Sequence, residues 1–290
     1  MSIYTGDENV SFIPESPKRI PDCNYYRNLW WNKGEFNEQA RWDEVTLPHV
    51  LATGVTPEDY EERVEKFNIR GCWEWSNSEV IIYEFPSKPH EVCLAKVVKV
   101  ITGACRNADN TPAEILGFGA TRTRDENRRK EADASFRPRK PAVTAPDGSD
   151  GISEPWPNLV VEVAYFETLG HVEETLKYWL DPDHAHDCII VKIDPVPEGQ
   201  MPARMRAWHY CKEDRRTRNT IPYRTSFEFG TQDGTGAPLN ILQGQCIINI
   251  SLRSLYHDLK PPTQIPLNLN DPIQLDFYFI QQAFILAYDN

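Results

Sequence analysis

Asn158–Leu180 reads NLVVEVAYFETLGHVEETLKYWL and combines two kinds of pattern. Its first part, Asn158–Phe166, is apolar except at Asn158 and Glu162. A short run that is rich in Val and aromatic residues predicts a strand buried on both faces. The second part places apolar residues at helical spacing behind Thr168, which is a suitable N-cap. Because an ionised Glu is almost never fully buried alone, Glu162 needs a metal ion, a Lys or an Arg beside it.

Further elements lie on both sides of this strand and helix. The order is typical of an α+β (α/β-like) core with a mixed central sheet flanked by helices. After Pro195 the pattern changes to short alternating runs with weak helix character, which predicts a β-rich C-terminal extension. We therefore expect an N-terminal arm and helix over 1–69, a core over 70–195 and the extension over 196–290. The expected helices cover 57–67 and 89–101, and the expected strands lie within 73–85, 114–121, 130–137, 187–193, 204–210, 226–229, 246–250 and 274–279.

The composition restricts the class of protein. The formal net charge of −12 argues against attraction of nucleic acid to the whole surface. No apolar run is long enough to span a membrane, and the first twenty residues lack the layout of a signal peptide. The seven Cys residues include no CxxC pair. These features predict a cytoplasmic or nuclear protein with reduced thiols that is not secreted and does not bind a membrane.

Two carboxylates are the strongest candidates for chemistry. Asp133 lies in one predicted strand and Glu162 in a later one, so both can point into one cleft if the strands are neighbours. Two carboxylates with water suit a hard cation such as Mg²⁺, which can clamp a phosphodiester and activate water. Lys177 on the following helix could orient the water or neutralise developing charge. Glu91, in the first turn of the helix over 89–101, could be a further outer acid.

Each candidate also has a purely structural interpretation. Asp133 could bond to a turn backbone, as Asp often does. Lys177 could be a solvated residue on an outer helix face. Glu162 could form a buried ion pair without a metal, with Arg122, Arg137 or Lys177 as its partner.

The order of a helix, an Asp on one strand and a Glu on the next resembles the PD-(D/E)XK nuclease superfamily, and more narrowly its restriction endonuclease domains. The resemblance covers roughly residues 70–195. It implies that Asp133 and Glu162 hold Mg²⁺ or Mn²⁺, and it matches a Ser-Pro-x-His element to the residues that lead to His90. The pieces that carry it are EVIIYEFPSKPHEVCLAKVVKVI over 79–101, KEADASFRP over 130–138 and PNLVVEVAYFETLGHVEETLKYWL over 157–180.

The chain departs from the family pattern at two positions. Ala132 stands where the motif usually has Pro, which does not change the metal-binding acid. Ala164 stands where the superfamily often has the catalytic Lys, so Lys177 on the next helix is the natural substitute. Lys177 lies two or three positions later than the helix Lys of closer relatives.

Two functions follow from the resemblance. The first is a metal-dependent endonuclease that hydrolyses phosphodiester bonds, with DNA favoured over RNA and a homodimer as its assembly. The second is a catalytically degenerate nuclease fold that binds nucleic acid or a protein. Basic residues in two stretches, 121–140 and 204–218, would contact phosphate, although ordinary solvated faces explain them equally well. These residues are Arg122, Arg124, Arg128, Arg129, Lys130, Arg215, Arg216 and Arg218.

A further motif, DPDHAHDC, covers Asp181–Cys188 and contains residue types that bind transition metals. Zinc sites usually need a second pair of ligands at a defined spacing, and the sequence offers none. A loop before a buried strand is the simpler interpretation of this motif.

Overall fold

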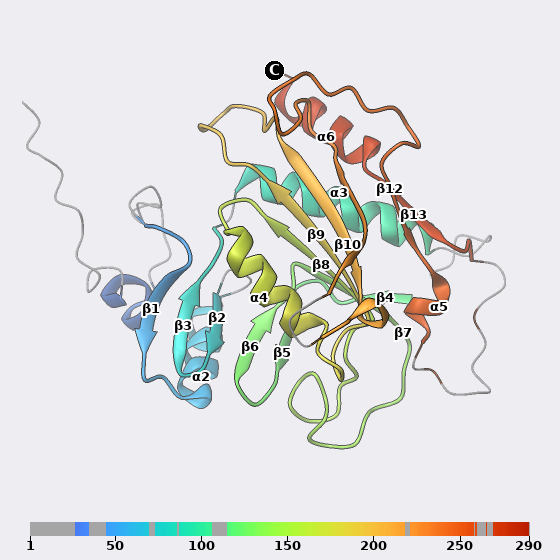
Figure 1. Ribbon diagram of the computed structural model, residues 1–290. Coiled ribbons are helices and arrows are strands. Elements are labelled where there is room, and N and C mark those ends of the chain that lie inside the picture. Colours follow the sequence, from blue (N-terminus) through green and yellow to red (C-terminus); the bar gives the residue numbers. More distant parts are fainter. Residues whose placement is uncertain are drawn as a thin grey trace, which may run out of the picture.

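A mixed sheet of six strands forms the centre of the protein in a computed structural model (Figure 1). The structure describes residues 27–34, 45–69, 73–85, 87–105, 115–217, 221–257, 259, 265 and 269–289. The strand order is β11-β10-β9-β8-β7-β4, in which only β8 and β9 run parallel. This confirms the α+β class with a mixed sheet. The strands are β4 (Ile115–Gly117), β7 (Ala134–Pro138), β8 (Leu159–Ala164), β9 (Asp187–Ile193), β10 (Met205–Cys211) and β11 (Tyr223–Glu228).

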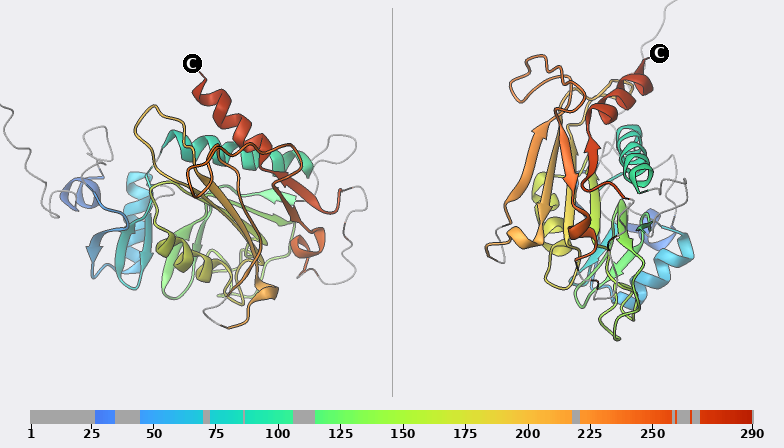
Figure 2. Two further views of the ribbon diagram at one scale, coloured as in Figure 1. Left: turned by 45° about the horizontal axis from the view of Figure 1, so that its top comes forward. Right: turned by 90° about the vertical axis from the view of Figure 1, so that its right-hand side faces the viewer.

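Helices cover both faces of this sheet. Helices α3 (Lys88–Ala104) and α6 (Tyr278–Tyr288) lie on one face, and α4 (Leu169–Trp179) lies on the other (Figure 2). Alternate residues of β8 accordingly join two different apolar clusters, with Val161 on the α3 side and Val160 on the α4 side. Every residue of β8 is buried, as its sequence predicts. The predicted Thr168 cap is also present, since its side chain accepts the His171 N–H.

A second sheet of five strands lies beside α4, in the order β1-β3-β2-β6-β5 (Figure 1). Its strands β2 and β3 form the hairpin that the Asn-Ser turn predicts, and Asn77 and Ser78 both have positive φ. Helix α2 begins at Pro57 with the Thr56 side chain as its cap. The elements are η1 (Arg27–Asn32), β1 (His49–Thr53), α2 (Pro57–Phe67), β2 (Trp73–Ser76), β3 (Glu79–Ile82), β5 (Arg122–Arg124) and β6 (Arg128–Glu131).

The predicted strand over 130–137 is wrong as a single element. The chain leaves the five-stranded sheet after β6 and enters the six-stranded sheet at β7, with Ala132 and Asp133 between them. Asp133 therefore lies on a bend rather than within a strand. The sequence shows no break at the crossing, because the last two residues of β6, Ala132 and all of β7 are buried.

The stretch after residue 195 is joined to the core. Strands β10 and β11 extend the central sheet, and α6 packs on α3. The predicted strand over 274–279 ends at Asp276, and α6 follows two residues later. Most of the expected arm over 1–50 lies outside the described residues. Helices in the described part of the chain are all too short or too polar to cross a membrane. The remaining elements are η3 (Lys212–Asp214), β12 (Ile247–Ile250), α5 (Leu252–Leu255) and β13 (Ile273–Asp276).

Candidate active site

Asp133 and Glu162 come together where the two sheets meet. The last antiparallel pair of β7 and β8 on this side is Ala134 with Val161, so Asp133 and Glu162 occupy the next step of the register. The Asp133 carboxylate takes the place of a backbone partner there, because its Oδ2 accepts the Val163 N–H at 2.6 Å. The strands β7 and β8 are neighbours as expected, but Asp133 lies on the bend before β7 and not in the strand.

His90 and Glu91 continue this group from the start of α3. His90 Nε2 lies 3.2 Å from Asp133 Oδ2, and His90 Nδ1 lies 3.1 Å from Glu91 Oε1. Burial disfavours the charged imidazole, but the Asp133 carboxylate outweighs it and raises the pKa of His90 to about 10. Burial likewise opposes the Asp133 charge, and His90 more than compensates, so the pKa of Asp133 is lowered. Glu91 thus reaches the acids only through His90.

Glu162 and Lys130 form the buried centre of the site. Glu162 is 2% exposed, and Trp179 donates its indole N–H to Oε1. Burial raises the pKa of Glu162 to about 8, against the attraction of Lys130 and with added repulsion from Asp133. Lys130 is entirely buried, and its ammonium lies 3.4 Å from Glu74 Oε2 and 3.5 Å from the centre of the Tyr83 ring. Lys130 is thus the lysine that interacts with Glu162. The sequence predicts it only as a phosphate contact.

Glu84 holds the end of β8, immediately after the acid. Its carboxylate accepts the backbone N–H groups of Phe85, Tyr165, Phe166 and Glu167 at 2.6–3.1 Å. Burial raises the pKa of Glu84, while these four donors act in the opposite direction. The sequence analysis did not identify Glu84, because a Glu at the end of a short strand has no pattern that distinguishes it from a surface residue.

Lys177 lies away from the acids. Its ammonium is 2.6 Å from Glu174 Oε1 on the outer side of α4, and the Lys177 side chain is 36% exposed. The expectation that Lys177 faces the cleft is therefore not met. The geometry is that of a solvated helix pair spaced three residues apart. Lys192 lies closer to the end of β8, since it pairs with Ala164 in the sheet and donates to the Tyr165 carbonyl at 2.5 Å.

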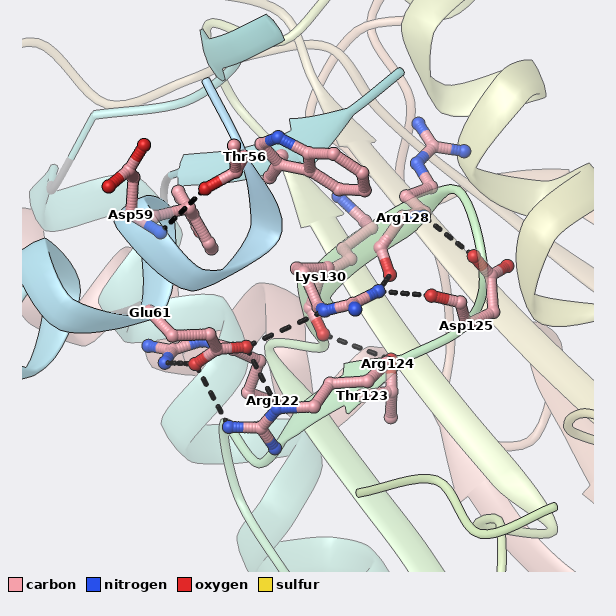
Figure 3. A network of polar contacts seen from close by, with 12 residues as sticks. Thr56, Asp59, Glu61, Arg122, Thr123, Arg124, Asp125, Arg128 and Lys130 are labelled. Carbon is pink, nitrogen blue, oxygen red and sulfur yellow. Dashed lines mark hydrogen bonds and ion pairs between the residues drawn. The ribbon is translucent and has the colours of Figure 1, made fainter. Parts of the chain in front are cut away.

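The arginines of the β5–β6 hairpin are engaged within the protein (Figure 3). Glu61 of α2 accepts from Arg122 at 2.8 Å and from Arg124 at 2.8 and 2.9 Å. Arg128 bonds to the buried Glu74 at 2.8 Å, and Arg129 lies 3.7 Å from Glu61. These two acids neutralise part of the charge of the four arginines, so the hairpin offers phosphate less charge than its sequence suggests.

The C-terminal basic residues are placed differently. Arg215 donates to the Leu180 carbonyl at 2.8 Å, and Arg216 is exposed. Arg218 lies outside the described residues. Trp208 and Tyr210 are partly buried against the α4 cluster, which leaves little of either ring for stacking on a base.

The two acids are a suitable donor set for a hard cation. Oδ1 of Asp133 and Oε2 of Glu162 make no hydrogen bond within the described part of the chain, so each acid keeps one oxygen available. Mg²⁺ and similar ions are commonly held by one or two carboxylates, with water and substrate phosphate completing the shell. A cavity of about 20 Å³ beside Ala132 and Trp179 has room for one water.

Similarity to known proteins is limited to solved structures. No protein-family model matches the chain. No curated protein matches it either. The chain is similar to a solved structure from Anabaena variabilis described as a "putative nuclease belonging to DUF820", with 12% identity, a TM-score of 0.40 and coverage of 76% of this chain and 97% of that chain. At this identity and TM-score the likeness does not bear on activity, and the function has to be argued from the contacts around Asp133 and Glu162.

Proposed function

We propose that the protein is a metal-dependent nuclease that hydrolyses phosphodiester bonds of nucleic acid, with Asp133 and Glu162 holding Mg²⁺ or Mn²⁺. The observation that supports this most is the register of β7 and β8, which brings the two carboxylates to adjacent positions. A divalent cation bound there would supply Lewis-acid stabilisation of a phosphoryl oxygen. Two acids side by side in a buried place otherwise carry a cost, because burial and mutual repulsion both raise the pKa of Glu162.

Other residues of the chain prepare this acid pair. His90 balances the Asp133 charge and holds its carboxylate toward β8. Lys130 attracts the negative form of Glu162 and so favours its ionisation. Glu84 accepts the N–H groups of the three residues that follow β8 and so fixes the backbone immediately after the strand that carries Glu162. These three act on the position and charge of the acids rather than on the substrate.

The test is Mn²⁺-dependent cleavage of plasmid DNA, single-stranded DNA and RNA by the wild type beside Asp133→Asn and Glu162→Gln. Glu198→Gln is the matched control, because Glu198 is an exposed acid far along the chain from the pair. We expect cleavage by the wild type and the control, and its loss in both site variants with circular dichroism unchanged. Cleavage that persists in both site variants would contradict the proposal.

A second function, a nuclease fold that binds a partner without cleaving it, is favoured by burial. Lys130 is 0% exposed and Glu162 is 2% exposed, so neither side chain is open to a phosphodiester in this structure. Lys177 also lies on the outer side of α4. This function predicts no cleavage and no calorimetric Mn²⁺ binding by the wild type, with DNA binding or a protein partner as the remaining activity.

A further inference from the structure

A second polar cluster lies at the other end of the central sheet. His186 precedes β9, Asp187 is its first residue, and Cys211 is the last residue of β10, where it pairs directly with Asp187. All three are buried, with exposed fractions of 2%, 1% and 0%. The Asp187 carboxylate and the His186 imidazole need partners there, because an unpaired charge or polar group is costly to bury.

The potential ligand atoms of these residues converge on one point. His186 Nδ1 lies 2.8 Å from Asp187 Oδ2 and 3.7 Å from Cys211 Sγ, and the three residues each present a ligand atom within 4.8 Å of the others. We propose that His186, Asp187 and Cys211 form a binding site for a transition-metal ion of the Zn²⁺ class, through Nδ1, Oδ2 and Sγ. Nitrogen, oxygen and sulfur ligands are the set that Zn²⁺ accepts, whereas Mg²⁺ and Ca²⁺ prefer oxygen alone.

Neighbouring groups orient the ligands as a second shell does around zinc. His209 Nε2 lies 2.8 Å from Asp187 Oδ1, the oxygen that faces away from the cluster. Glu213 Oε1 lies 3.6 Å from His186 Nε2, the ring nitrogen that the metal would not use. A carboxylate on the second nitrogen of a ligating His fixes the ring and increases the basicity of the ligating nitrogen.

The backbone around the cluster is held in place without a metal. Asn158 accepts the N–H groups of both His186 and Asp187 on its carbonyl at 3.0 and 2.8 Å, and the Lys212 N–H donates to the His186 carbonyl at 2.8 Å. The three ligands therefore come from fixed sheet positions. Three protein ligands leave the fourth tetrahedral position to water or an external group. The residues Lys212 and His257 beside the cluster also line a hollow of about 900 Å³.

Metal uptake at this cluster has to remove a proton. Burial raises the pKa of Cys211 to about 12, with Asp187 adding repulsion, so the thiol is neutral without a metal. A metal ion takes the thiolate, and the proton leaves to solvent. The five Cys residues in the described part of the chain are free, so no disulfide there competes for Cys211.

The motif DPDHAHDC pointed to this region, but its partner residues come from β10. Cys188, the Cys of the motif, belongs to the apolar cluster under α4 and contributes nothing. The third ligand is Cys211, which pairs with Asp187 in the sheet, and His209 contacts Asp187 from two residues earlier on β10. A spacing of one residue between His209 and Cys211 is that of a strand and does not resemble a zinc-finger spacing.

The test is Co²⁺ binding by the reduced, chelator-treated full chain, followed by absorption spectroscopy. In an Asp133→Asn background, which removes the acid pair as a competing site, we expect one ion per chain and a sulfur-to-cobalt charge-transfer band in the near ultraviolet. Cys211→Ser should lose the band, and Cys246→Ser should keep it, because Cys246 is a buried thiol elsewhere that donates to the Glu228 carbonyl. A wild type without the band, or a band that survives Cys211→Ser, would overturn the proposal.

Calorimetry with Zn²⁺ separates this site from the Asp133–Glu162 pair. Asp133→Asn should retain binding of one Zn²⁺, and adding Asp187→Asn to that variant should abolish it. His209→Gln keeps all three ligands and should weaken Zn²⁺ binding by about 10–100-fold. Zn²⁺ binding that depends on Asp133 and not on Asp187 would overturn the proposal, and circular dichroism of each variant excludes misfolding as the cause.

Discussion

The Lys130 ammonium attracts the Glu162 carboxylate, although the strands that carry these two residues belong to different sheets. Lys130 is at the end of β6 and Asp133 follows three residues later on the bend that leads to β7. One short stretch thus supplies both an acid and a cation to the same buried place.

Lys130→Met should lower the free energy of unfolding by about 3–5 kcal/mol, because it leaves buried carboxylates without their cation. Lys130→Met with Glu162→Leu should recover part of the loss. The coupling in this double-mutant cycle should exceed about 1 kcal/mol and be larger at pH 9 than at pH 7, since Glu162 ionises near pH 8. Urea unfolding measures all four corners. A coupling near zero at both pH values would show that Lys130 serves Glu74 alone.

Lys177→Ala is the contrasting substitution. Its partner Glu174 is exposed, and surface pairs contribute little, so we expect a change within about 0.5 kcal/mol. Any Mn²⁺-dependent cleavage should also be unchanged, because Lys177 does not reach the acids. Loss of cleavage in a fully folded Lys177→Ala protein would restore the role that the sequence predicts for it.

His90→Gln should reveal a stability term that depends on pH. The pKa of His90 is about 10 in the folded protein against 6.5 ordinarily, so its contribution is complete below pH 6.5 and is lost as pH rises through 10. The pKa of Asp133 is lowered, so the stabilisation by the His90–Asp133 ion pair is also lost as the pH falls below 3.8 and Asp133 becomes protonated. Wild type should therefore exceed His90→Gln by about 1–3 kcal/mol between pH 4.5 and 6.5 and converge with it above pH 10. A constant difference across this range would contradict the ion pair.

Most of the fold follows from sequence periodicity. The strand over 158–166, the helices after Pro57 and Thr168, and the strand over 187–193 all carry short-range patterns, and the structure has each of them. The inner face of α3 is an exception. Its spacing predicts Val92, Ala95, Val98 and Ile101 on the inner face. Of these only Ile101 is fully buried, together with Cys93 and Val97. Helix α3 packs on the sheet and on α6, so both sets of apolar residues are at least partly covered. Hydrophobicity alone therefore cannot show which set is more deeply buried.

The site was predictable only in part. The closeness of Asp133 and Glu162 could be predicted, since β7 and β8 are neighbours and Asp133 directly precedes β7. The role of Lys130 beside Glu162 could not be predicted. It depends on the chain passing from one sheet to the other between β6 and β7, and no sequence pattern marks that passage. Within a charged hairpin, a buried lysine and a solvated arginine look alike until the strand on each side is known.

Glu84→Gln should destabilise the protein by about 2–3 kcal/mol. The carboxylate accepts four backbone N–H groups, and the amide replaces one of its oxygens with a group that cannot accept. Hydrogen exchange should show faster exchange of the amides at residues 165–167. Glu198→Gln, at an exposed acid, is the matched control and should change neither property. Unchanged exchange at 165–167 would show that these amides are held by the sheet and not by Glu84.

Glu61→Gln should weaken the contact between α2 and the β5–β6 hairpin by about 1–3 kcal/mol, because Glu61 accepts three hydrogen bonds from two arginines. Burial opposes the Glu61 charge, but Arg124 and Arg122 lower its pKa below 4.5, so its contribution is present above pH 4.5 and is lost on further acidification. Urea unfolding at pH 7 and pH 3 should therefore give a large difference from wild type at pH 7 and a smaller one at pH 3. Glu65→Gln on the exposed face of the same helix controls for loss of a carboxylate. Equal losses in Glu61→Gln and Glu65→Gln would mean that the arginines of the hairpin do not rely on Glu61 and remain available to bind phosphate.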